Sequence, residues 1–211
     1  MSLLTKTVPI LVVLSFLGVL PGLAQGVQEH GKQHGFWAGL GLGYGSARSS
    51  CDTCSTSPRL GGWSFSGNFG WMPGQHVRVG VEFREWLNGL KKNSPLPVIT
   101  TATMLMSYYA RAGAGPFVDG GVGLSHYMIG KGTGDPIEPF SRDTTYASGA
   151  GWGYTLGVGW TVRSLGSSFT PRITYAFGNK RTLHAPDGAP VATGWEPRLL
   201  LVEGAWRGGP F

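Results

Sequence analysis

The sequence is poor in charge, in cysteine and in long apolar segments. Only 13% of its 211 residues are charged, against about 25% in an average soluble domain. After the first residues no run of eighteen consecutive apolar residues follows, which excludes a later membrane-spanning helix. The net charge is +6, yet no basic run is interleaved with aromatic residues, so nucleic-acid binding is not indicated.

Glycine and aromatic residues, in contrast, are abundant. The chain has 36 glycines and 12% aromatic residues, whereas glycine usually makes up about 7% of a protein. Abundant glycine alone would indicate disorder, but disordered chains contain few aromatic side chains. Low charge with many aromatics would also fit a soluble β-sandwich. A sheet that shows an apolar face to lipid and packs small residues inside accounts for the low charge, the abundant glycine and the abundant aromatic residues.

The N-terminal residues have the composition of a secretory signal peptide. One Lys lies within residues 1–6, residues 8–20 are almost wholly apolar, and the small residues Gly22 and Ala24 predict cleavage after Ala24. The alternative is a retained anchor, although the apolar run is too short to span a bilayer as a helix. No Cys follows the cleavage site, which argues against a lipoprotein. We expect a cleaved signal peptide over residues 1–24, a periplasmic leader over 25–34, a barrel over 35–207 and a short tail over 208–211.

Alternation of apolar and small side chains predicts strands, because successive residues of a strand point to opposite faces. In residues 62–71, two tryptophans and two phenylalanines share one face, while glycine, serine and asparagine share the other. Residues 149–162 repeat this pattern. Six further segments alternate less regularly, near residues 36–45, 76–84, 98–111, 118–128, 168–177 and 197–206.

Two of these segments carry apolar residues on both faces. In residues 98–111 and 197–206, alternation alone does not choose the outward face. We assign the outward face to Met104, Met106, Tyr108, Leu200, Val202 and Trp206.

The connections between the eight segments alternate in length. Short connections with turn-forming residues lie at residues 72–75, 112–115 and 164–167, and long ones at 47–57, 88–96, 131–147 and 179–193. Outer-membrane barrels have short periplasmic turns and long extracellular loops. The pattern predicts an all-β fold, namely an eight-stranded antiparallel up-and-down transmembrane β-barrel with both ends on the periplasmic side.

The face opposite the apolar one carries small residues and charges of both signs. Arg78, Glu82, Arg84, Asp119 and Arg172 fall on it, and Glu203 is a further candidate. Because enclosed charges without partners are costly, we expect these side chains to pair as a charge network across the lumen. Eight closed strands leave an interior just wide enough for side chains, so the predicted lumen is filled.

Two pairs of tryptophans have the spacing of an aromatic girdle. Trp63 and Trp71 lie eight residues apart on one face, and so do Trp152 and Trp160. This separation is roughly 26 Å along a strand, or about 20 Å along the membrane normal for a tilt near 40°, close to the ~25 Å apolar band of such barrels. The alternative is that these side chains fill the core of a soluble, lipocalin-like barrel.

Two phrases, GFWAGLGLGYG at residues 35–45 and PFVDGGVGL at residues 116–124, carry a family resemblance. With the strand pattern, nearly all of the mature chain resembles the small OmpX-like and OmpA-transmembrane-domain-like outer-membrane barrels. The resemblance implies a monomer in the outer membrane of a Gram-negative-type cell, in contact with outer-membrane lipids and lipopolysaccharide. It also implies insertion by the barrel-assembly machinery, which recognises a final outward aromatic residue. Pro210 cannot donate to a strand ladder, so either Trp206 is that residue, ahead of the terminal Phe211, or the signal is unusual.

Few residues offer candidate chemistry. Cys51 and Cys54 lie in a predicted loop, where an oxidising compartment favours a disulfide; the alternative is a metal or redox role, but no second cysteine pair exists and Ser55 replaces the His of a haem motif. Ser125 and His126 are adjacent, but their side chains face opposite sides of a strand. The His-x-Ser-Asn motif of lipid A deacylases is absent. We therefore expect no catalytic residue, no cofactor and no metal ligand.

The predicted function is a structural or surface-interaction role, in membrane integrity, adhesion or lipopolysaccharide contact. The alternatives are a lipid A-modifying hydrolase or acyltransferase, and a narrow pore. The predicted loops form a mildly basic rim that suits lipopolysaccharide phosphates or is simply a solvated surface. Its basic residues are Arg48, Arg59, Lys91, Lys92, Lys131, Arg142, Lys180 and Arg181.

Overall fold

The computed structural model describes residues 35–52, 58–89, 95–132, 140–164 and 167–209. The predicted signal peptide and leader lie outside the described residues. In the part that is described, no helix is long and apolar enough to cross a membrane. The strands are β1 (Gly35–Ser50), β2 (Leu60–Gly74), β3 (Val77–Leu87), β4 (Pro95–Arg111), β5 (Ala114–Gly132), β6 (Phe140–Ser164), β7 (Ser167–Gly178), β8 (Arg181–His184) and β9 (Pro190–Gly208).

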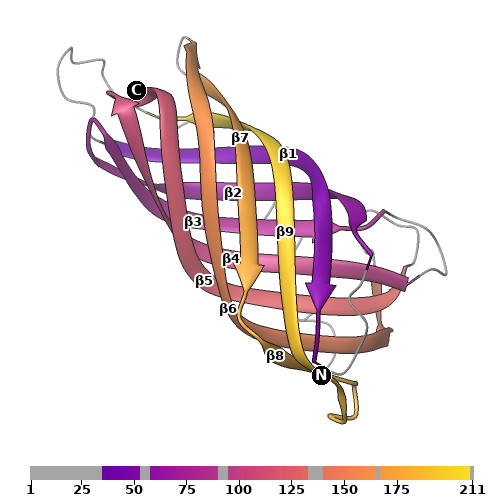
Figure 1. Cartoon of the computed structure of the whole chain (residues 1–211). Coiled ribbons are helices and arrows are strands. Elements are labelled where there is room, and N and C mark those ends of the chain that lie inside the picture. The colour runs from indigo at the N-terminus through magenta and orange to yellow at the C-terminus, as the bar shows by residue number, and fades with distance from the viewer. Residues whose placement is uncertain (1–34, 53–57, 90–94, 133–139, 165–166, 210–211) are drawn as a thin grey trace, which may run out of the picture.

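The strands form one antiparallel sheet that closes on itself (Figure 1). The strands from β1 to β7 are neighbours in chain order. β7 then pairs with β9, and β9 pairs with β1 to close the ring. The short strand β8 follows β7 after two residues and, like β7, pairs with both β6 and β9, so it continues the seventh barrel strand. The predicted eight-stranded barrel is confirmed. In lipid, this closure leaves no open edge with unpaired backbone groups.

The outward face of the barrel is largely apolar in its middle section. Met104 is 72% exposed, Val202 63% and Trp206 64%, so the outward faces assigned to the two ambiguous segments are confirmed. The inward neighbours of these residues, such as Leu105 and Leu201, are buried. Because so many apolar side chains point outward, this surface is stable in the hydrocarbon core of a bilayer and not in water.

The strands continue further into the predicted loops than the sequence indicated. β6 begins at Phe140, inside the predicted 131–147 connection, and β8 lies inside the predicted 179–193 connection. The cause is an apolar cluster inside the barrel at this end, which keeps the strands paired beyond the regular alternation. Its buried members are Ala47, Trp86, Ile99, Tyr127, Ala147, Ala176, Leu183, Trp195, Leu199 and Leu201.

At the opposite end the connections are tight. Two residues join β2 to β3 and two join β4 to β5. In the second of these turns Gly113 has φ of 54°, a conformation that favours glycine, and its N–H donates to the carbonyl of Gln75 at 2.6 Å. Neighbouring turns are thereby tied to each other.

Glycines on the inward face make room for large side chains of the neighbouring strands. A Cβ added at Gly43 would lie 2.5 Å from Glu203 Cγ and 2.7 Å from the carbonyl oxygen of Val202. One added at Gly80 would lie 2.9 Å from the ring of Trp37. The glycine content of the sequence therefore follows from filling a narrow lumen with long polar and aromatic side chains.

Replacing Gly43 by alanine tests this packing. We expect Gly43→Ala to lower the free energy of unfolding by about 1–3 kcal/mol, the usual range for overpacking, because the new Cβ collides with backbone as well as with Glu203. Gly67→Ala is the matched control, since its Cβ would meet only Leu40 Cδ2 at 3.8 Å. Urea unfolding of both variants in detergent micelles makes the comparison. Equal stability of the two variants would contradict the packing described here.

Candidate functional site

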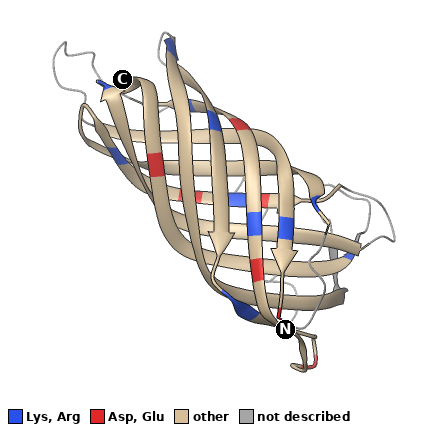
Figure 2. Cartoon of the chain, in the orientation of Figure 1, with Lys and Arg blue, Asp and Glu red and all other residues tan. Residues whose placement is uncertain are grey.

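Five charged side chains meet inside the middle of the barrel. Glu82 and Arg84 come from β3, Asp119 from β5, Arg172 from β7 and Glu203 from β9, each at an inward position of its strand. All five are buried, with at most 6% of the residue exposed. Figure 2 shows charged positions of both signs along the middle of these strands. We call these five residues the lumen network.

Arg172 and Arg84 bridge the three carboxylates. Arg172 Nη2 lies 2.6 Å from Glu82 Oε2 and 2.9 Å from Glu203 Oε2, and its Nη1 lies 3.2 Å from Asp119 Oδ2. Arg84 Nη2 lies 2.6 Å from Glu82 Oε1 and 3.0 Å from Glu203 Oε2. The network therefore links four strands across the lumen, and charge-assisted hydrogen bonds of this kind are strong.

Glu203 is the residue on which most of these bonds converge. Besides the two arginines, Ser64 Oγ and Thr174 Oγ1 each donate to it at 3.2 Å. The sequence marked Glu203 only as a further candidate, because its segment carries apolar residues on both faces. Whether Glu203 points inward is decided by the register of β9 with β1 and β7. This register places Glu203 opposite Gly43 and Arg172.

Arg78, predicted as part of the same network, lies in a second group near the turns. Its Nη1 donates to Tyr109 Oη at 2.9 Å and its Nη2 to the carbonyl of Gly113 at 3.3 Å. Arg207 Nη1 donates to the same Tyr109 hydroxyl at 3.1 Å. The guanidinium carbons lie 4.6 Å (Arg78) from the ring centre of Tyr109 and 5.4 Å (Arg207) from that of Trp37, within cation–π range. Sequence reasoning missed Arg207 and Tyr109.

The four tryptophans of the predicted girdle lie on the outward face of β2 and β6. Trp63, Trp71, Trp152 and Trp160 are each about half exposed. Trp63 contacts Tyr44 of β1 edge to face, with ring centres 5.4 Å apart. The structure thus places all four where lipid would surround them.

The loop end carries two exposed ion pairs. Lys180 Nζ lies 2.7 Å from Asp52 Oδ1, which joins the end of β1 to the segment between β7 and β8. The hydrogen bond to Asp52 raises the pKa of the Lys180 ammonium. Arg198 Nη2 lies 2.9 Å from Glu196 Oε1. Such exposed pairs contribute little to stability.

The remaining candidate residues do not form a chemical site in the structure. Cys51 is disulfide-bonded, while Cys54, its predicted partner, lies outside the described residues. On β5, Ser125 is buried on the inward face and His126 is exposed on the outward face. Within the described ranges, no three His, Cys, Asp or Glu side chains lie close enough together to hold a metal ion.

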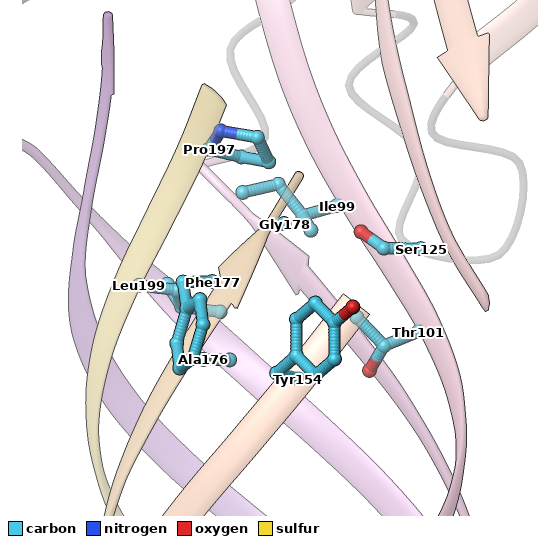
Figure 3. A pocket seen from close by; sticks show the side chains of 9 residues that line it. All are labelled: Ile99, Thr101, Ser125, Tyr154, Ala176, Phe177, Gly178, Pro197 and Leu199. Carbon is cyan, nitrogen blue, oxygen red and sulfur yellow. The ribbon is translucent and has the colours of Figure 1, made fainter. Parts of the chain in front are cut away.

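A small hollow lies at the wall where β7 ends (Figure 3). Its lining comes from β4, β5, β6, β7 and β9, and Gly178 faces Pro197, which has no N–H to donate. The cavity volume is about 10 Å³, which is room for one water at most. It cannot hold a substrate. The lining residues are Ile99, Thr101, Ser125, Tyr154, Ala176, Phe177, Gly178, Pro197 and Leu199.

Comparison with known proteins places the chain among outer-membrane barrels. Residues 15–171 match a family model described as the outer membrane protein beta-barrel domain. Neisserial surface protein A is 14% identical with a TM-score of 0.53, over 82% of this chain and 96% of that one. Ail of Yersinia pestis, the attachment invasion locus protein crystallised with the heparin analogue sucrose octasulfate, is 12% identical with a TM-score of 0.50, over 82% of this chain and 98% of that one. No curated protein sequence matches the chain.

Removal of one carboxylate tests the lumen network. We expect Glu203→Gln to lower the free energy of unfolding by about 1.5–3 kcal/mol, because a neutral amide replaces the charge-assisted hydrogen bonds from Arg84 and Arg172 and brings an NH₂ donor among groups that already donate. Glu196→Gln, in the exposed pair with Arg198, should leave the stability near the wild-type value. Both are measured by urea unfolding in the same detergent. A Glu203→Gln barrel as stable as the Glu196→Gln barrel would refute the network's structural role.

Proposed function

The chain belongs to the outer membrane protein beta-barrel domain family and lies in the outer membrane of a Gram-negative-type cell; on this premise, we propose that it is a non-catalytic surface protein. Its barrel would serve as a rigid anchor in the bilayer. The strands that extend beyond the apolar band would hold the loop end in place for contact with molecules at the cell surface. The proposed role is structural or interactive, in membrane integrity, adhesion or lipopolysaccharide contact.

The filled lumen is the observation that carries this proposal. The apolar cluster occupies the loop end, the lumen network occupies the middle, and the aromatic group around Tyr109 with two arginines occupies the turn end. A pore would need a continuous polar path through these three layers. Among the described residues, side chains that bond to each other across the lumen interrupt such a path, which supports an anchor over a channel.

We further propose that the tryptophans mark the two edges of the bilayer. Trp63 and Trp152 would lie at the outer interface and Trp71 and Trp160 at the inner one, where amphipathic rings are favoured. Trp206, 64% exposed near the end of β9, would serve as the last outward aromatic residue read by the barrel-assembly machinery. Gly209, with φ of 135°, leaves the strand directly afterwards.

An enzymatic role has less support. Ser125 and His126 point to opposite sides of the wall, so they cannot act together as nucleophile and base, which need hydrogen-bond contact. The exposed His126 side chain has no hydrogen bond or ion pair within the described residues. A lipid-modifying activity would therefore have to be assembled from groups that the structure does not bring together.

Conductance in planar bilayers tests the closed barrel. Purified, folded protein should give no stable single-channel current, because the lumen is blocked at three levels. The double variant Arg84→Ala/Glu82→Ala removes two side chains of the central layer only. It should still give no large conductance, because the layers at the loop end and the turn end remain. A stable, large current from the wild-type protein would contradict the proposal.

Mass spectrometry tests the absence of catalysis. Lipid A incubated with the folded barrel in mixed micelles should keep its acyl chains, with the same mass distribution as lipid A incubated with boiled protein. Loss or gain of an acyl chain that requires folded protein would contradict the non-catalytic role and would indicate a hydrolase or an acyltransferase.

A further inference from the structure

Three arginines lie next to one another on the outer wall near the loop end. The register of β1 and β9 places Arg48 directly opposite Arg198. On the other side of β1, Ala47 pairs with Leu60, so Arg59, which precedes Leu60, comes next to Arg48. All three are exposed, and Figure 2 shows basic positions of β1 and β9 side by side at this end. We call Arg48, Arg59 and Arg198 the arginine row.

The arginine row lies just beyond the aromatic layer of the same strands. Tyr44 pairs with Trp63, and two residues further on Ser46 pairs with the small residue Gly61. The arginines follow after two more residues. Four residues correspond to roughly 13 Å along a strand, or about 10 Å along the membrane normal at the usual tilt. This is the depth of the lipid headgroups, and a flexible arginine can reach back toward them.

The charge of this row is largely uncompensated. Arg198 is bonded to Glu196, but within the described part of the chain Arg48 and Arg59 make no ion pair or side-chain hydrogen bond. The nearby carboxylate of Asp52 is bonded to Lys180. The row therefore presents at least two free guanidinium groups beyond the contact between Tyr44 and Trp63.

The opposite wall has no such charge at the same level. On β6 the outward residues beyond Trp152 are Ala150 and Ser148, and on β5 the outward residue beyond His126 is Met128. On β4 the residue paired with Met128 is Val98, which is buried against Leu87 and Leu96. Among the described outward positions at this level, cationic side chains are therefore concentrated on β9, β1 and β2, which is the pattern of a binding face and not of a uniformly solvated rim.

We propose that the arginine row binds the phosphate groups of lipopolysaccharide in the outer leaflet. Guanidinium groups hold phosphate with two parallel hydrogen bonds each. The sugar that carries the phosphate would lie between the arginine row and the aromatic pair of Tyr44 and Trp63, whose rings would contact the start of the acyl chains. This inference rests on the proposed function, because it requires the barrel to lie in the outer membrane with its loop end outward.

Titration with lipid A provides the test. The folded barrel, held in zwitterionic detergent, is titrated with bisphosphorylated lipid A, and the bound lipid is counted by native mass spectrometry. The double variant Arg48→Gln/Arg59→Gln should bind about 25-fold more weakly, at roughly fivefold for each basic residue lost. Arg111→Gln/Arg163→Gln is the matched control, since it removes the same charge at the turn end, away from the row. Its affinity should stay within about twofold of wild type.

Dephosphorylated lipid A and a folding check complete the design. Wild-type protein should bind dephosphorylated lipid A as weakly as the double variant binds the phosphorylated form, and all proteins should show the same heat-modifiable migration. Equal binding by wild type and double variant, or an equal loss in the control variant, would overturn the proposal. Conductance of the same preparations separates the two proposals, because an open channel would refute the closed barrel without changing the lipid A result.

Discussion

The buried network of two arginines and three carboxylates holds together strands that are far apart in the sequence. Burying so many charges is unfavourable unless each finds partners, and Glu203 alone accepts from Arg84, Arg172, Ser64 and Thr174. These partners belong to β2, β3 and β7, so they can meet only when the sheet has closed. The network thus couples closure of the barrel to satisfaction of its charges. The glycines of β1, Gly43 above all, provide the space in which it forms.

The bilayer explains why polar and apolar residues exchange places relative to a soluble protein. Hydrocarbon offers no hydrogen bonds, so every backbone group must be paired within the protein, and pairing of β9 with β1 removes the last free edge. The apolar side chains then serve as the contact with lipid, and the interior takes the charges. Where the strands leave the apolar band, apolar side chains such as Trp86, Leu199 and Leu201 move inside. This layering makes the loop end a compact platform.

The sequence predicted the architecture directly where alternation was strict, and where both faces are apolar it predicted the outward face but not how far the strands extend. Trp63, Trp71, Trp152 and Trp160 stand in strict alternation, and their strands were identified without ambiguity. Ile99 and Leu199 point inward into an apolar layer, so β4 and β9 do not alternate between apolar and polar residues there. The extension of the strands at this end could therefore not be predicted from alternation. Glu82, Arg84, Asp119 and Arg172 could be placed inward from their own strands. Their partners could not be chosen, because pairing depends on the register around the ring, and the same limit hid the roles of Glu203, Arg207 and Tyr109.

The filled lumen is the feature on which this account depends most, and hydrogen exchange of the arginine guanidinium groups measures it most directly. In nuclear magnetic resonance spectra of the folded barrel, the guanidinium protons of Arg84 and Arg172 should exchange with water far more slowly than those of the exposed Arg48 and Arg59. Slow exchange limited to Arg84 and Arg172 is the result that a closed lumen predicts. Exchange at Arg84 and Arg172 as fast as at Arg48 would show water running through the barrel and would contradict a filled lumen.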